Sequence, residues 1–160
     1  MPSFDITSEF NEQEVVNAID QTKRELSTRY DFKNTNTTIN KNDSLITLKS
    51  STQERLNASI QVIKEKFTKR NVSIKFLNDF KEETTPSEVK IIYDLKSGIN
   101  QEESKKIIFL IKDFNKKTQC SFQNESIRVT SKKRDELQDI ITFLKESKID
   151  LPISFGNFRD

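Results

Sequence analysis

Apolar side chains recur at intervals of three and four residues in four segments, which predicts four amphipathic helices. Asn11 and Glu14 precede the first segment in the spacing of a capping box, and Asn100 and Glu103 precede the third in the same spacing. The four predicted apolar faces consist of Val15, Ile19, Thr22, Leu26 and Tyr30; Leu56, Ile60, Ile63 and Phe67; Ile107, Leu110, Ile111 and Phe114; and Leu137, Ile140, Ile141 and Leu144.

Short runs that alternate or are rich in β-branched residues lie between these helices and predict strands. Turns are expected at Asn42-Asp43 and Asn124-Glu125, and the polar, acidic segment 78–87 is the expected junction of two domains. The order is βαββαβ twice, so the predicted fold is α+β with two ferredoxin-like units, each an antiparallel sheet with helices on one face. The predicted strands are Ser3 to Thr7, Thr35 to Asn40, Leu45 to Lys49, Val72 to Phe76, Val89 to Leu95, Gln119 to Gln123, Ser126 to Thr130 and Ile153 to Phe155.

The first unit is longer than the second between its two helices. Asn11 and Asn100 are 89 residues apart, whereas the expected second helix starts, Ser51 and Ser131, are 80 apart, which leaves nine extra residues around positions 29–34. We expect this insertion to have a packing or a binding role, and a tolerated loop insertion is the alternative.

Several chemistries are excluded by the residues that the chain lacks. It has no histidine, so it has neither a histidine base nor the commonest metal ligand. Gly98 and Gly156 are the only glycines, which excludes the glycine-rich phosphate loops. No acidic pair has the apolar surroundings that would separate two pKa values. We therefore expect no enzyme activity, no cofactor and no metal site.

The start of the chain and its cysteine content indicate the compartment. Residues 1–6 form no secretory signal, and no apolar run approaches the length of a membrane span. Cys120 is the only cysteine, as is usual in a reducing environment. We expect a cytoplasmic protein without a membrane partner.

The segment Lys132-Lys133-Arg134 is predicted to open the fourth helix, where cations oppose the helix dipole. Its cations and free backbone N–H groups would suit a phosphate. The alternative is a solvated basic turn that Asp135 and Glu136 offset. The net charge of only +2 does not choose between these interpretations.

Aromatic residues add two candidates for ligand contact. The alternation of the strands turns polar residues to the open sheet face of the second unit, which argues against RNA binding by aromatic residues on that face. Phe32 and Phe158 lie outside the predicted helices and beside basic residues. Arg29, Lys33 and Arg159 join the candidate site if the insertion and the C-terminal tail fold against the same corner.

Three stretches resemble the YajQ family of bacterial proteins along the whole chain. They are Pro2-Ser3-Phe4-Asp5-Ile6, then Thr28-Arg29-Tyr30-Asp31-Phe32-Lys33, and finally Arg128 to Leu137 with Phe155 to Asp160. The resemblance implies that the two units exchange their N-terminal strands, giving domains of residues 1–10 with 98–160 and of residues 11–97.

The family is described as nucleotide- or nucleic-acid-binding, and some members as cyclic di-GMP effectors that act with transcription regulators. Two functions therefore remain open. One is a non-catalytic protein that binds a nucleotide or an RNA, such as tRNA, through phosphates at the basic helix start. The other is a module that responds to cyclic di-GMP and acts through a protein partner such as a transcription regulator.

Overall fold

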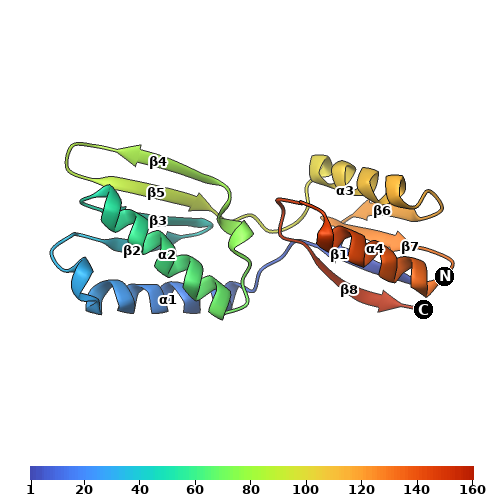
Figure 1. Ribbon diagram of the computed structural model, residues 1–160, viewed down its shortest axis with the longest axis horizontal. Helices are drawn as coiled ribbons and strands as arrows, with labels where there is room; N and C mark the ends of the chain where they lie inside the picture. Colours follow the sequence, from blue (N-terminus) through green and yellow to red (C-terminus); the bar gives the residue numbers. More distant parts are fainter. The chain divides into compact units, whose positions relative to one another are not determined.

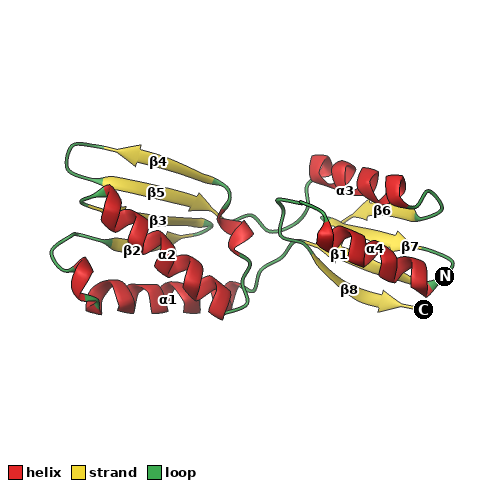
Figure 2. Ribbon diagram, viewed as in Figure 1, coloured by secondary structure: helices red, strands yellow, loops and turns green.

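The computed structural model describes all 160 residues and divides the chain into two compact units. Unit 1 consists of residues 1–9 and 97–160, and unit 2 of residues 10–96. Each unit is a four-stranded antiparallel sheet with two helices on one face (Figures 1 and 2). The α+β class and the two ferredoxin-like units predicted from the sequence are confirmed.

Unit 1 has the strand order β6-β7-β1-β8. The helices α3 and α4 pack on this sheet around Phe4 and Ile6, which are fully buried. The elements are β1 (Ser3–Thr7), α3 (Gln101–Phe114), β6 (Gln119–Gln123), β7 (Ser126–Thr130), α4 (Arg134–Glu146) and β8 (Ser154–Arg159).

Unit 2 has the equivalent strand order β2-β3-β5-β4. Its core lies between this sheet and two 17-residue helices, α1 and α2. The elements are α1 (Glu12–Thr28), a short 3-10 helix η1 (Tyr30–Phe32), β2 (Thr38–Asn42), β3 (Leu45–Ser50), α2 (Gln53–Lys69), a second 3-10 helix η2 (Ile74–Leu77), β4 (Phe80–Thr84) and β5 (Val89–Asp94).

The expected strand exchange is confirmed. β1 precedes the first helix of unit 2 in the chain but pairs with β7 and β8 of unit 1, where Phe4 lies opposite Val129. β5 precedes α3 of unit 1 but pairs with β3 and β4 of unit 2, where Ile91 lies opposite Leu48. Each unit therefore obtains one of its two central strands from the other half of the sequence.

The fourth strand of unit 2 is not where the sequence predicts it. The segment from Val72 to Phe76 runs into η2, in which Ile74 is exposed, so its apolar alternation does not mark a strand. β4 lies instead in the segment 78–87, which is a hairpin arm and not a domain junction. All five residues of this edge strand are exposed.

Capping explains where the helices begin. Asn100 and Glu103 form both hydrogen bonds of a capping box at α3, and Asn11 accepts a hydrogen bond from the backbone of Glu14 at α1. The cap of α2 is Thr52, one residue later than Ser51. None of the helices is long and apolar enough to cross a lipid bilayer.

One predicted helix face is wrong at its end. α1 stops at Thr28, and Tyr30 lies in η1 with 87% of its surface exposed.

Candidate functional site

The basic segment of unit 1 lies just before α4, which begins at Arg134. Lys133 is the N-cap residue, and its side chain makes no capping hydrogen bond. Only Arg134 of the three cations is therefore in the first helical turn, which also contains Asp135 and Glu136, so the prediction of three cations inside the turn is wrong. The segment leaves the first-turn N–H groups of α4 without a side-chain acceptor from the cap.

A bulge in β8 turns Phe158 toward the helix side of the sheet. Asn157 has a φ of +52°, and the register with β1 shifts between Ser3 and Asp5. Residues 155 and 158 therefore lie on the same side, and the ring centroids of Phe155 and Phe158 are 5.9 and 6.0 Å from that of Phe4. An unbroken strand would place residues 155 and 158 on opposite faces.

A pocket of about 410 Å³ opens between α4, the end of β8 and the start of the chain. Leu137, Ile141 and Phe158 supply apolar surface, and Phe158 is 65% exposed. Arg134 and Arg159 lie at the same pocket, so the structure brings together three of the residues predicted from the sequence. The remaining lining residues are Pro2, Ser3, Gln138 and Asp160.

Apart from Arg134, the α4 side of this pocket was missed from the sequence. Arg134, Leu137, Gln138 and Ile141 follow the i, i+3, i+4, i+7 pattern of one helix face, which is the signal that could have found them. Leu137 and Ile141 were assigned to the core alone, and they are indeed buried while also lining the pocket.

Several cations gather at one end of unit 1. Thr130 of β7 pairs with both Gln119 of β6 and Ser3 of β1, and Ser3 also pairs with Arg159 of β8. The chain segments next to these residues therefore meet at the same end of the sheet. Figure 1 shows the end of β7, the start of α4 and both chain termini there. We call this surface the basic end; it consists of Lys116, Lys117, Lys132, Lys133, Arg134 and Arg159.

These cations are largely free of internal partners. Of the six, only Arg134 forms an ion pair, with Asp160, and both side chains are at least 70% exposed. An ion pair so exposed contributes little to stability. The basic end therefore contains one weak ion pair and five cations that form none.

The open face of the same sheet is polar. Asp5 accepts hydrogen bonds from Arg128 Nε at 3.1 Å and from Asn157 Nδ2 at 2.6 Å. Burial alone would raise the pKa of Asp5, but the hydrogen bonds and the charges of Arg128 and Arg159 lower it below its ordinary value. Asp5 is thus a fixed carboxylate that ties β1 to β7 and to the bulge of β8.

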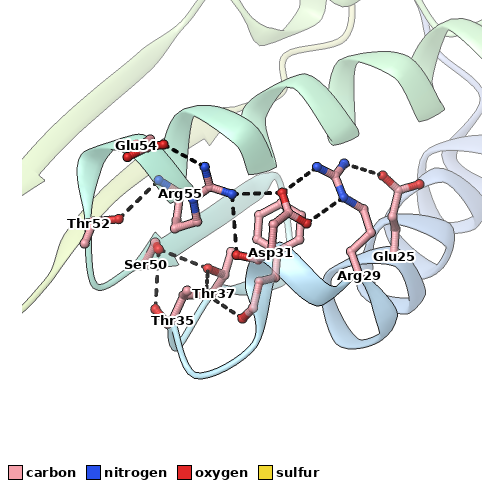
Figure 3. A network of polar contacts seen from close by, with 10 residues as sticks. Glu25, Arg29, Asp31, Thr35, Thr37, Ser50, Thr52, Glu54 and Arg55 are labelled. Atoms are coloured by element: carbon pink, nitrogen blue, oxygen red, sulfur yellow. Dashed lines mark hydrogen bonds and ion pairs between the residues drawn. The ribbon is translucent and has the colours of Figure 1, made fainter.

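Arg29 belongs to a polar network in unit 2 (Figure 3). Its Nε and Nη2 donate to the two carboxylate oxygens of Asp31 at 2.9 and 2.7 Å, and its Nη1 donates to Glu25 at 2.9 Å. Arg55 donates to Asp31 at 2.8 Å and to Glu54 at 2.9 Å. Asp31 therefore joins the end of α1 to the start of α2.

Hydrogen bonding sets the ionisation of this network. The hydrogen bond from Arg29 lowers the pKa of Asp31, and hydrogen bonds from Lys66 and Arg29 lower the pKa of Glu25. The pKa of Arg29 is raised by the same two carboxylates, Asp31 first. Both arginines of the network already have carboxylate partners.

The insertion of unit 2 is packed against its own core. Phe32, predicted from the sequence as a candidate ligand contact, is 4% exposed and lies in the core, with the Arg29 guanidinium 4.8 Å from its ring centroid. The hydroxyl oxygen of Thr37 lies 2.6 Å from that of Thr35 and 3.0 Å from that of Ser50. These contacts favour a packing role for the insertion.

The eight predicted site residues thus divide into two groups. Lys132, Lys133, Arg134, Phe158 and Arg159 belong to unit 1, whereas Arg29, Phe32 and Lys33 belong to unit 2. Ser131, just before the basic segment, has no positive φ, and its hydroxyl donates a hydrogen bond to Glu136.

The carboxylates of the chain differ from those of a general acid or base. Each carboxylate with a resolved pKa shift, namely Asp5, Glu25 and Asp31, has a lowered pKa, whereas a general acid at neutral pH needs a raised one. The side chains also form no cluster of three or more potential metal ligands.

Comparisons with known proteins agree along the whole chain. A family model described as nucleotide-binding protein YajQ-like matches residues 2–159. A protein of Coxiella burnetii (strain RSA 493 / Nine Mile phase I), named nucleotide-binding protein, is 44% identical over 160 residues. The aligned residues cover 100% of this chain and 100% of the relative.

Two further relatives carry the same name. One from Mycobacterium marinum is 42% identical over 159 residues, with 98% of each chain covered. One from Trichodesmium erythraeum is 43% identical over 158 residues, which cover 98% of this chain and 97% of the relative. The full-length match, these identities and the two exchanged ferredoxin-like units lead to one conclusion: the chain belongs to the YajQ-like family.

Proposed function

We propose that the protein is a non-catalytic nucleotide- or RNA-binding protein that holds phosphate groups at the basic end of unit 1. The observation that carries this proposal is the pocket that joins Arg134, Phe158 and Arg159, next to four lysines without ion pairs. The three relatives are all named nucleotide-binding protein, which supports the same ligand class.

A phosphate would bind where Asp160 now meets Arg134. The guanidinium of arginine offers paired donors that match a phosphate as well as a carboxylate. A phosphate monoester carries more charge than the carboxylate it replaces and a phosphodiester carries as much, and either can also accept hydrogen bonds from the free N–H groups at the start of α4. Lys132 and Lys133 add charge beside this position.

The pocket also suits the rest of a nucleotide. Its volume of about 410 Å³ falls within the roughly 300–1,000 Å³ typical of small-molecule sites. The exposed ring of Phe158 offers a face on which a base can stack, with Leu137 and Ile141 as apolar neighbours. Arg159 and Gln138 lie at the pocket to donate hydrogen bonds.

Binding without turnover follows from the same residues. The pocket contains one carboxylate, Asp160, which is exposed and paired with Arg134, and it contains no histidine.

The test measures binding of three fluorescent probes, a 12-nucleotide uridine RNA, GMP and cyclic di-GMP, by anisotropy at several salt concentrations. We expect the variant Lys132→Gln/Lys133→Gln/Arg134→Gln to remain folded and to bind the preferred probe more weakly. If that probe is RNA, each lost phosphate contact should flatten the log–log salt dependence by about 0.7.

Matched controls come from unit 2. Lys23→Gln/Arg24→Gln removes two exposed cations that form no ion pair, and Tyr30→Ala removes an exposed aromatic ring. Unchanged affinity in the triple variant, with its fold verified by circular dichroism, would reject the site. Binding of cyclic di-GMP alone would favour the regulatory module that acts through a protein partner.

A further inference from the structure

α3 carries more apolar side chains than it buries against the sheet of unit 1. Residues 107–111 form an unbroken apolar run, but only Ile107 and Ile111 of this run are buried. Phe109 is 71% exposed, whereas none of the other three long helices carries an exposed large apolar side chain within its bounds. The packing of unit 1 does not explain why an aromatic ring lies on the solvent-exposed side of this helix.

Lysines lie on both sides of Phe109 along one face of α3. Lys105, Phe109 and Lys112 follow one another at intervals of four and three residues, and Lys116 comes four residues later, after the helix. All four residues are exposed, and none of the three lysines forms an ion pair. We call this line the α3 stripe; the acidic residues Glu102 and Asp113 lie beside it on the helix surface.

The α3 stripe leads into the basic end. α3 ends at Phe114, and the turn that follows contains Lys116 and Lys117, which belong to the basic end. A shallow hollow of about 420 Å³ lies beside Phe109, lined by Lys105, Lys106 and Leu110. An aromatic face with lysines around it is the arrangement that binds single-stranded nucleic acid through base stacking and phosphate contacts.

We propose that the α3 stripe is a second contact surface for single-stranded RNA, on which Phe109 stacks a base while Lys105, Lys112 and Lys116 contact phosphates. This inference rests on the proposed function, because it requires that the basic end binds RNA. A line of exposed cations runs from the pocket to Phe109, and apart from Arg134 none of them forms an ion pair. This line favours an RNA strand over an acidic segment of a protein, which would need only the local hollow.

The width of the sheet determines how long an RNA must be to contact both the pocket and the α3 stripe. β8 and β6 are the two edges of the sheet of unit 1, three strand spacings apart, which corresponds to about 14 Å. The pocket lies at the β8 edge and α3 contacts β6. A mononucleotide in the pocket cannot reach Phe109, so only a longer strand should respond to changes in α3.

The experiment compares fluorescein-labelled uridine RNAs of 2 and 12 nucleotides with four proteins: the natural chain, Phe109→Ala, Lys105→Gln/Lys112→Gln, and the pocket variant Phe158→Ala. We expect Phe109→Ala to weaken binding of the 12-nucleotide RNA at least about five-fold and to leave the 2-nucleotide RNA unaffected. Lys105→Gln/Lys112→Gln should flatten the salt dependence of the longer RNA by about 1.4.

Tyr30→Ala and Lys23→Gln/Arg24→Gln in unit 2 are the matched controls, and neither should change binding of either RNA. Phe109 is exposed, so its replacement by alanine should preserve the fold, which circular dichroism verifies. If Phe158→Ala weakens binding while the α3 variants bind both RNAs normally, the second surface is rejected and the proposed function stands. If the natural chain binds neither RNA, the second surface is rejected, and the proposed function is rejected as well if GMP and cyclic di-GMP also fail to bind.

Discussion

At the scale of single residues, the presence of a carboxylate partner distinguishes the Asp31 network of unit 2 from the basic end of unit 1. In unit 2, Arg29 and Arg55 share the carboxylate of Asp31, and Lys66 contacts Glu25 at 2.9 Å. At the basic end of unit 1, Lys132 and Lys133 form no ion pair. Arg29 and Arg55 therefore hold the insertion in place, whereas Lys132 and Lys133 have no such structural role.

Replacing Lys133 with aspartate should separate stability from binding. Lys133 has the extended backbone of an N-cap residue but no capping hydrogen bond. An aspartate there can supply it, so we expect the free energy of unfolding to rise by about 0.5–2 kcal/mol while phosphate affinity falls. Urea unfolding and probe binding measure the two effects. Lys132→Asp is the control, and an equal gain in stability from that variant would contradict the explanation.

The Asp31 network should make unit 2 sensitive to acid. The pKa of Asp31 is lowered from its ordinary value of 3.8, so its ionised form stabilises the fold at neutral pH and this stabilisation disappears as the pH falls through the lowered pKa. We expect Asp31→Asn to lower the urea midpoint at pH 7. The difference from the natural chain should vanish well below pH 3.8, and a difference that persists there would show that shape and not charge is responsible.

At the scale of elements, the bulge in β8 determines what the pocket contains. Without Asn157 in the left-handed region, Phe158 and Arg159 would exchange faces of the sheet. The side-chain amide of Asn157 also bonds to Asp5, which fixes the bulge against β1.

Substitution of Asn157, which does not line the pocket, should therefore change the pocket by moving Phe158. Asn157→Val places a β-branched residue at a φ of +52°, a conformation that costs about 1–2 kcal/mol for an L-residue. We expect the bulge to relax, Phe158 to leave the pocket and nucleotide affinity to fall. Asn157→Gly, which tolerates this φ, should keep the pocket. Nuclear Overhauser contacts between the rings of Phe4 and Phe158 report the difference, and their survival in Asn157→Val would refute it.

Much of the fold was predictable because periodicity is a local property. All four helices, the Asn124-Glu125 turn and most strands follow from it. β4 was missed because an edge strand with every residue exposed shows no apolar alternation. Val72 and Phe76 imitate a strand because both are buried, although the chain between them turns into a 3-10 helix.

The site was predictable only in part, for a similar reason. The basic segment and Phe158 stand out from their neighbours in the sequence. Their meeting in one pocket depends on the bulge at Asn157, whose position no apolar pattern marks. The burial of Phe32 likewise depends on long-range packing in unit 2.

At the scale of the whole molecule, the strand exchange makes unit 1 depend on a distant part of the sequence. Phe4 and Ile6 are fully buried in unit 1, and β1 pairs on both of its edges. The rest of unit 1 begins only at residue 97.

Deleting residues 1–8 should consequently damage the distant helices and spare the adjoining one. Loss of β1 removes two core side chains, leaves β7 unpaired on one side and leaves β8 without a partner strand. We expect hydrogen exchange to accelerate in 107–114 and 137–144, while 15–26 in α1 keeps its protection. Loss of protection in α1 alone would contradict the exchange.

The exchange also has a consequence during protein synthesis. β1 is among the first residues to leave the ribosome, but its partner β7 follows only after the whole of unit 2 and α3. At translation rates of about 5–20 residues per second, the strand with Phe4 and Ile6 waits for roughly 6–24 s without a partner. Unit 2 can fold in that interval, since its residues are contiguous, and an apolar strand then remains attached to a folded body. Nascent chains should for this period be substrates for chaperones that shield apolar segments.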